Sequence, residues 1–214
     1  MPTSETDIDE SVPSGGPRTS LTRDLITVGV FTALYFAVKY VFGQLGALSP
    51  VTQVLGPGYI PILCGIPFAL FLSRVHRFGL ITGMGWIVGI LYIITGMSWI
   101  TTLLAFTLSV VADFIAYLGK YKRWSLLVLA YVIFSEMGIG SVIPLFFQRE
   151  RVLKGAATRH PQAWVDQIAT LTPMWMFYGM MAMMAVGAVI GLFIGRGIFR
   201  KHFSYLSTKK TPAN

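Results

Sequence analysis

The feature that most constrains this chain is a series of long apolar runs that contain almost no charge. Six such runs follow one another, and most of them approach or exceed the roughly 20 residues that a helix needs to cross a bilayer. They extend over residues 25–45, 59–73, 78–94, 97–118, 124–147 and 172–199. Apolar surface of this length gains nothing from contact with water. The sequence therefore predicts an all-α integral membrane protein with six transmembrane helices.

The overall composition agrees with this prediction and excludes other classes of protein. Charged residues make up 12% of the 214 positions and hydrophobic residues 54%, whereas a soluble protein carries about 25% charged residues. The chain has a single cysteine, Cys64, so it cannot be a disulfide-stapled scaffold. The net charge of +8 comes from basic residues that flank the apolar runs. We therefore expect no nucleic-acid partner.

The basic residues predict how the helices are oriented. Twelve of the seventeen Lys and Arg residues lie before the first run, between the second and third, between the fourth and fifth, or at the end of the sixth and beyond it. Because Lys and Arg collect in cytoplasmic loops, both termini are predicted to be cytoplasmic, in the cell (cytoplasmic) membrane. Lys39 lies inside a run, and four more basic residues share one outer loop. Those four are Arg149, Arg151, Lys154 and Arg159.

Three segments are predicted from the change in composition along the chain. Residues 1–22 are polar and rich in Ser, Gly and Pro, which predicts a disordered cytoplasmic tail. Residues 23–203 form the six-helix membrane domain, and residues 204–214 form a second cytoplasmic tail. A single domain is therefore expected to carry the function.

Two loops are expected on the outer side of this domain. The first, residues 46–58, contains a Gly56-Pro57-Gly58 bend. The second, residues 148–171, has apolar residues from Trp164 to Leu171 at near-helical spacing, which predicts a short amphipathic helix. Long loops are often lids over a binding site, but many only connect two helices. Both interpretations of the second loop remain open.

Apart from Arg196 at the end of the sixth run, three charged side chains lie within the runs, where each is costly in hydrocarbon and is a functional candidate. Lys39 lies in the outer third of the first run, from which it either extends to the interface or meets a substrate carboxylate or phosphate. Glu136 lies near the middle of the fifth run and either pairs with Lys39 or a structural partner, or contacts the substrate. Asp113 is expected to have a local partner such as Lys120 or Arg123.

Aromatic and sulfur-containing side chains gather towards the predicted outer side. The tryptophans Trp99 and Trp175 either belong to an interfacial belt or stack on a flat ligand. Six methionines, beginning with Met174, open the last run and either fill the packing or contact a bulky apolar or haem-type ligand. The candidate substrate-binding residues are therefore Lys39, Glu136, Trp99, Trp175 and Met174.

The sequence gives no sign of catalysis or of a metal site. The three histidines are not at metal-ligand spacing, and the chain lacks a phosphate-binding loop, a His-Glu-x-x-His motif and a Gly-x-Ser-x-Gly motif. We therefore expect neither an enzyme nor a bound cofactor, and energy from ATP would have to come from partner chains.

Small residues recur every four positions in the first and last runs. Four-residue spacing aligns them in a stripe along one helix face, which lets another helix approach closely. Each stripe is either a contact within the protein or a docking surface for another membrane subunit. The stripes are Gly29, Ala33 and Ala37, and Gly187, Gly191 and Gly195.

Several segments, in this order on six runs, resemble one family of membrane proteins. The segments are DLITVGVFTALYF (24–36), GIPFALFLSRVHRFG (65–79), ADFIAYLGKYKRW (112–124), LTPMWM (171–176) and IGRGIFRKHF (194–203). The chain resembles the substrate-binding S components of energy-coupling factor (ECF) transporters, of the Trep_Strep or MptD type. The resemblance extends over almost the whole chain after residue 20.

This resemblance implies a fold, partners and a function. S components are six-helix proteins that capture a scarce micronutrient, here vitamin-like or a tetrapyrrole such as haem, on the outer side. They deliver it through a transmembrane coupling subunit energised by two cytoplasmic ATPase subunits, and they topple in the membrane to release it. An Ala-x-x-x-Ala motif in the first helix contacts the coupling subunit, and Ala33 and Ala37 match it. The resemblance thus favours a docking role for Gly29, Ala33 and Ala37. We also expect the cytoplasmic basic clusters to contact anionic membrane lipid.

Other classes of protein remain as alternatives. A stand-alone secondary membrane transporter is the first, although it should show inverted repeats and interrupted helices at the midplane. No convincing repeat relates residues 25–118 to residues 119–199. A membrane-embedded enzyme or an assembly scaffold is the third possibility.

Overall fold

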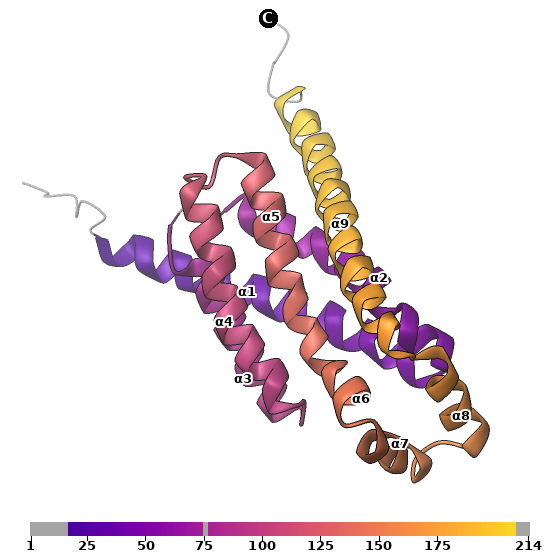
Figure 1. The fold of residues 1–214 in the computed structure, drawn as a ribbon. Helices are drawn as coiled ribbons and strands as arrows, with labels where there is room; N and C mark the ends of the chain where they lie inside the picture. Colours follow the sequence, from indigo (N-terminus) through magenta and orange to yellow (C-terminus); the bar gives the residue numbers. More distant parts are fainter. Residues whose placement is uncertain (1–16, 75–76, 209–214) are drawn as a thin grey trace, which may run out of the picture.

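The computed structural model describes residues 17–74 and 77–208, in which every regular element is a helix (Figure 1). The longer elements are α1 (Pro17–Gln44), α2 (Pro50–Leu72), α3 (Leu80–Ile94), α4 (Trp99–Leu118), α5 (Trp124–Ser135) and α9 (Met174–Thr208). The shorter ones are the 3-10 helices η1 (Leu45–Ala47) and η2 (Glu136–Ser141), and α6 (Ile143–Phe147), α7 (Arg149–Ala157) and α8 (Gln162–Leu171). The all-α prediction is confirmed.

The helices include several that are suited to a membrane. Among the described residues, five segments are long and apolar enough to cross one, and α3 is a shorter apolar helix of 15 residues. The five segments are Thr22–Ala47, Pro50–Leu72, Trp99–Leu118, Trp124–Ser141 and Met174–Ile198. Each matches one of the predicted runs.

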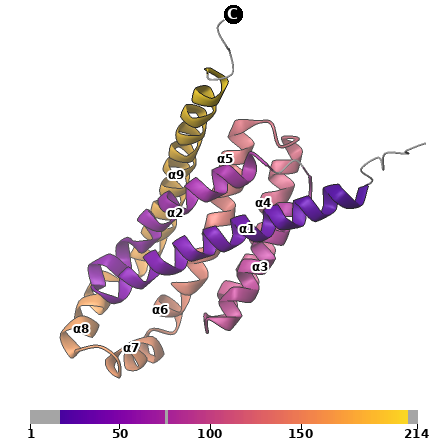
Figure 2. The ribbon, with the colours of Figure 1, turned by 180° about the vertical axis from the view of Figure 1, so that it is seen from behind.

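The bundle has two distinct ends. The end of α9 and the connection 119–123 lie in the upper part of Figure 1, the start of α1 lies at the left, where Asp24 pairs with Arg77, and α7 and α8 lie at the lower end. Figure 2 shows α1 and α2 on the face opposite to that of Figure 1. We refer to the two ends as the termini end and the α7–α8 end.

The boundaries of the predicted tails can be compared with the structure only in part. Helix α1 begins at Pro17, inside the segment 1–22 for which a disordered tail is predicted. Helix α9 likewise continues to Thr208, inside the predicted tail 204–214. The remaining tail residues, 1–16 and 209–214, lie outside the described residues.

The predicted outer loop 46–58 is largely helical, which corrects the expectation of a bend at Gly56-Pro57-Gly58. Helix α2 begins at Pro50, where the Ser49 side chain accepts a hydrogen bond from the backbone N–H of Val51 at 3.3 Å. It then continues through Pro57. A membrane helix tolerates internal prolines where neighbouring helices and local adjustments of the backbone satisfy the groups that proline frees.

Close contact between α2 and α9 explains why the small residues of α9 recur every four positions. A Cβ atom placed on Gly191 would lie 2.6 Å from the backbone oxygens of Pro61 and Ile62. Gly195 is equally close to Ala69, and Gly187 faces the backbone of Gly58. The α9 stripe is therefore a contact within the protein, one of the two interpretations that the sequence allowed.

Hydrogen bonds to the Asp113 side chain join the start of α3 to α4 at the termini end. Its fully buried carboxylate accepts hydrogen bonds from the backbone N–H groups of Gly79 (2.8 Å) and Thr82 (3.0 Å) and from the Thr82 hydroxyl (2.9 Å). The hydroxyl of Tyr121 donates a fourth, at 2.6 Å. The expectation of a Lys120 or Arg123 partner is therefore wrong. The first N–H groups of α3 lack partners within the helix, and they draw in the carboxylate instead.

Candidate functional site

The fifth predicted helix is interrupted at Glu136, and this break is the starting point of the candidate site. Helix α5 ends at Ser135 and the chain continues as the 3-10 helix η2, which contains Gly138 and Gly140. A 3-10 segment in the middle of an apolar span often marks a functional position. Within a membrane, irregular backbone is tolerated where protein or a cavity surrounds it.

Glycine lets two other helices come close to η2. A Cβ atom on Gly140 would lie 2.5 Å from the Cα atom of Thr101, so α4 touches the η2 backbone directly. A Cβ atom on Gly138 would lie 3.4 Å from the Nζ atom of Lys39, on α1. The break therefore brings polar side chains from α1 and α4 to one place.

Lys39 has an aromatic partner in this region. Its Nζ atom lies over the ring of Tyr92 at 4.9 Å from the centroid, a cation–π contact. The ammonium group therefore lies beside both α3 and η2, and its contact with a substrate stays a prediction. We name Lys39, Tyr92, Thr101 and Glu136 the η2 cluster, because Glu136 begins η2, Lys39 and Thr101 lie close to its glycines, and Tyr92 contacts Lys39.

Three members of the η2 cluster carry buried polar atoms without a hydrogen-bond partner. These atoms are the Tyr92 hydroxyl oxygen, the Thr101 Oγ1 and the Glu136 Oε2. Buried polar groups in proteins are nearly always hydrogen-bonded, so a group that is not calls for an explanation. One lies in η2, one on α4 against η2, and one on α3 at Lys39, and a polar ligand that reached all three would satisfy them.

The two charged members of the cluster are not paired with each other. Among the described residues, neither Lys39 nor Glu136 takes part in an ion pair. The alternative in which Glu136 pairs with Lys39 is therefore not realised. Both side chains are half-buried and retain charge-bearing atoms for another partner.

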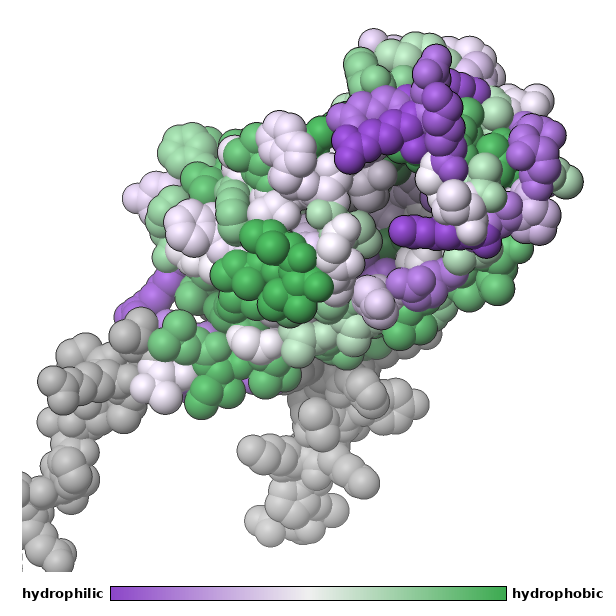
Figure 3. Space-filling model, turned by 90° about the horizontal axis from the view of Figure 1, so that it is seen from below, coloured by the Kyte–Doolittle hydropathy of each residue, from purple (hydrophilic) through white to green (hydrophobic). Residues whose placement is uncertain are grey.

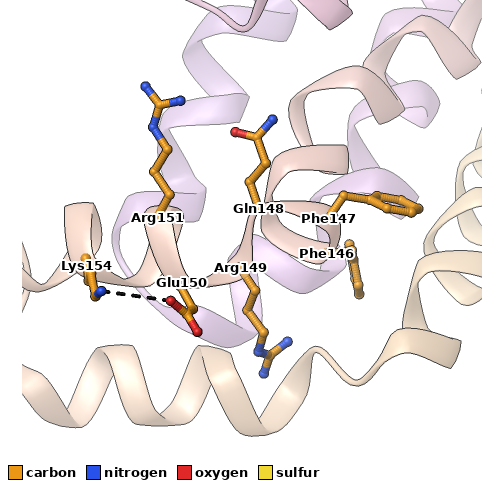
Figure 4. Close-up of a pocket in the computed structure, with 7 residues that line it drawn as sticks. All are labelled: Phe146, Phe147, Gln148, Arg149, Glu150, Arg151 and Lys154. Atoms are coloured by element: carbon orange, nitrogen blue, oxygen red, sulfur yellow. Dashed lines mark ion pairs between the residues drawn. The ribbon is translucent and has the colours of Figure 1, made fainter.

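A second feature lies at the α7–α8 end, where Figure 3 shows a hollow with hydrophilic side chains along its rim. A cavity of about 630 Å³ lies beside α7, which follows η2 and α6 along the chain. Seven consecutive or nearly consecutive residues line it, shown in Figure 4. They are Phe146, Phe147, Gln148, Arg149, Glu150, Arg151 and Lys154.

Arg149 holds α8 next to this cavity. Its guanidinium donates to the backbone oxygens of Ala169 and Thr172, the latter at 2.6 Å, at the C-terminal end of α8. A cation at this position also complements the helix dipole. Val165 and Ile168 are buried, so the predicted amphipathic helix in loop 148–171 is confirmed. Helix α7 in the same loop was not expected.

The other predicted substrate-binding residues lie elsewhere on the surface. Trp99 is 72% exposed, Trp175 69% and Met174 51%, at the starts of α4 and α9. No contact given by the structure joins them to the η2 cluster. Their role in binding a ligand stays a prediction.

The small-residue stripe of α1 differs from that of α9. Gly29, Ala33 and Ala37 are all exposed, and a Cβ atom on Gly29 would meet nothing within 4 Å. No helix of the described chain occupies this stripe, so it does not serve the internal packing that one interpretation assigned to it. We call it the α1 face.

Sequence reasoning missed Tyr92 and Thr101 in the cluster, and it did not link the cavity residues 146–154 to a site. Neither Tyr92 nor Thr101 carries charge, and both occur in apolar runs as ordinary membrane residues. The signal that could have found the region is Gly138-Ile139-Gly140 within a span, because two glycines beside a Glu mark a close backbone approach.

The described residues show no geometry for metal chemistry. Residues 17–74 and 77–208 contain no group of three or more His, Cys, Asp or Glu that could hold an ion. What the site offers instead is one ammonium, one carboxylate and two hydroxyl groups for non-covalent binding.

The comparisons with known proteins are consistent with this picture of a membrane-embedded, multi-pass chain. No curated protein and no solved structure matches the sequence. A family model does match, over residues 22–204, which is nearly the whole described chain. Its description is that of a hypothetical bacterial integral membrane protein. The chain therefore belongs to the Trep_Strep family of bacterial integral membrane proteins.

Proposed function

We propose that the chain is the S component of an ECF-type importer, the subunit that captures a scarce micronutrient and has no catalytic activity of its own. The observation that carries this proposal is the η2 cluster, with its three unpartnered buried polar atoms and an unpaired Lys39. An apolar bundle has no structural use for such groups, since each is costly without a partner. A captured polar ligand would supply the missing contacts.

In this proposal, the basic residues fix the orientation of the helices in the membrane. The chain crosses the cytoplasmic membrane six times, with α3 as the shortest span, and the termini end is cytoplasmic. Helix α3 rises about 22 Å over its 15 residues, and a thinner local bilayer accommodates a short span. The η2 cluster and the cavity then lie towards the outside, where the substrate arrives.

The α1 face supports the choice of an S component over a protein that works alone. Its small residues are exposed although small residues usually serve close helix contact. In the proposal this face docks on the transmembrane coupling subunit, which connects the chain to two cytoplasmic ATPases. In the proposal, α7 and α8 form a lid over the binding site, and Arg149 holds α8 in position through its hydrogen bond to the backbone oxygen of Thr172.

The experiment that tests this proposal identifies the small molecule that stays bound to the protein through purification. Protein expressed in bacteria in rich medium is purified, and the small molecules that heating releases are identified by mass spectrometry, with an absorbance spectrum to detect a tetrapyrrole. We expect one vitamin-like or tetrapyrrole compound at about one equivalent. Lys39→Met and Glu136→Gln should lower its amount by about tenfold, because a hydrogen bond to a charged group contributes ~1.5–3 kcal/mol.

The control is Lys122→Met, which removes an exposed cation at the other end of the bundle. It should retain as much compound as the wild type. Equal retention by Lys39→Met and Glu136→Gln, with unchanged thermal stability, would contradict the assignment of the η2 cluster as the binding site.

A further inference from the structure

The cavity beside α7 has an apolar side and a cationic side. Phe146 and Phe147 end α6 and supply the apolar side, and the remaining lining residues are polar or charged. Its volume of about 630 Å³ lies within the ~300–1,000 Å³ that is usual for small-molecule sites. A molecule with an apolar body and a charged group would fit both sides.

The charges of the lining are not equivalent, because three of them already have partners. Arg149 donates to the end of α8, and Lys154 lies 3.9 Å from Glu150 in an ion pair. Arg151 has no hydrogen-bond or ion-pair partner among the described residues. The net charge that remains for a ligand is therefore positive and centres on Arg151.

Gln148 and Arg151 face the same way. Figure 4 shows both side chains extending to one side of α7, while Arg149 extends to the opposite side. A guanidinium presents a planar fork of N–H groups that matches a carboxylate or a phosphate, and a glutamine amide adds two further donors. The pair therefore forms a donor surface for an oxyanion in a cavity that two phenylalanines also line.

We propose that this cavity binds an organic anion with an apolar body, whose acidic group contacts Arg151 and Gln148 while its body lies against Phe146 and Phe147. The inference rests on the proposed function only in taking this anion to be the substrate that the chain captures. The loop opposite the main basic side supports it, because its four basic residues outnumber its two acidic residues, Glu150 and Asp166, and leave it a net positive charge. The acidic group is drawn to the cavity by this local positive potential.

The test compares an acid with its neutral counterpart. Naphthoate and naphthamide share one apolar body, and their binding to the full chain is measured by calorimetry in nanodiscs of neutral phosphatidylcholine. We expect naphthoate to bind about tenfold more tightly than naphthamide, as suits a charge-assisted hydrogen bond. Higher salt should weaken the binding of naphthoate only.

Substitutions at one position separate charge from geometry. Arg151→Gln should abolish the preference for the acid, and Arg151→Lys should retain part of it, because lysine keeps the charge and loses the fork. Arg159→Gln removes a basic residue of the same loop that does not line the cavity, and it should keep the full preference. The proposal is overturned if the wild type binds naphthoate and naphthamide equally, or if Arg159→Gln loses the preference for the acid as fully as Arg151→Gln does.

An anionic lipid headgroup has the same acidic chemistry, so it is tested separately. Nanodiscs that contain phosphatidylglycerol should leave naphthoate binding within about twofold of that in phosphatidylcholine. The proposal is overturned, and the cavity is assigned to lipid, if phosphatidylglycerol abolishes the binding of naphthoate and co-purifies with the wild type but not with Arg151→Gln. Failure of the importer assignment is distinguishable, since it would remove the coupling partners and leave the acid preference of the cavity intact.

Discussion

At the scale of single residues, Lys39 shows how a membrane protein can hold a charge for a purpose other than stability. Its ammonium group lies over an aromatic ring, and no carboxylate pairs with it among the described residues. A cation–π contact contributes only ~0.5–2 kcal/mol, which is less than the cost of an unpaired charge inside a membrane. Lys39 therefore lowers the stability of the empty protein.

We predict that Lys39→Met leaves the protein at least as stable as the wild type. Methionine fills a similar volume without a charge to desolvate, so the thermal midpoint in detergent should be equal or a few degrees higher. Circular dichroism during heating measures it. A midpoint several degrees lower would mean that the ammonium group is a structural element.

Asp113 is the opposite case, a buried charge whose every observed contact is structural. Its carboxylate accepts four hydrogen bonds at the start of α3. Burial, together with the hydrogen bond to Asp113, raises the pKa of the Tyr121 hydroxyl above its usual range. Tyr121 therefore stays protonated and remains a donor across the physiological pH range.

We predict that Asp113→Asn destabilises the fold by about 1–3 kcal/mol, because an amide is a weaker acceptor and brings a donor towards other donors. Tyr121→Phe removes one hydrogen bond and should cost about 1 kcal/mol. Denaturant titration in detergent, with the wild type alongside, gives both values. An Asp113→Asn protein as stable as the wild type would show that the four contacts contribute nothing.

At the scale of elements, the sequence predicts which segments are helical better than it predicts where they break. Apolar runs indicate membrane helices because length and hydropathy alone decide them. They do not show that α2 continues through Pro57 or that α5 gives way to η2, since both depend on the helices packed around them. Proline is a local helix-breaking signal, and α2 continues through Pro57 in spite of it.

The candidate site divides in the same way. Lys39 and Glu136 are visible in the sequence because charge is rare within the runs, and the structure places both beside or within η2. Tyr92 and Thr101 are not visible, because their role depends on which helices meet at Gly138 and Gly140. Only the assembled bundle shows that their polar atoms lack partners.

The two small-residue stripes give a matched pair of substitutions. We predict that Gly191→Ala destabilises the protein by about 1–3 kcal/mol, because the added methyl group would meet the α2 backbone at 2.6 Å. Gly29→Ala should be neutral or slightly stabilising, since nothing lies within 4 Å and alanine favours a helix. Thermal midpoints in detergent compare them, and equal losses would contradict the contrast between the stripes.

At the scale of the whole molecule, the bundle has one function proposed for each region. The η2 cluster contacts the ligand, the cavity beside α7 receives its acidic group, and the α1 face docks on a partner. The η2 cluster and the α1 face share helix α1, where Lys39 and Ala37 lie two residues apart, whereas the residues that line the cavity belong to 146–154. In the proposal, the α1 face is the region that connects ligand capture to transport.

The most direct measurement is native mass spectrometry of the complex purified through a tag on this chain. We predict a mass for this chain with one coupling subunit and two ATPase subunits. Substituting both Ala33→Leu and Ala37→Leu should abolish this species without changing thermal stability, because the larger side chains prevent close helix contact at an exposed face. A chain that is always alone, or a complex that survives both substitutions, would contradict the proposed role as an S component.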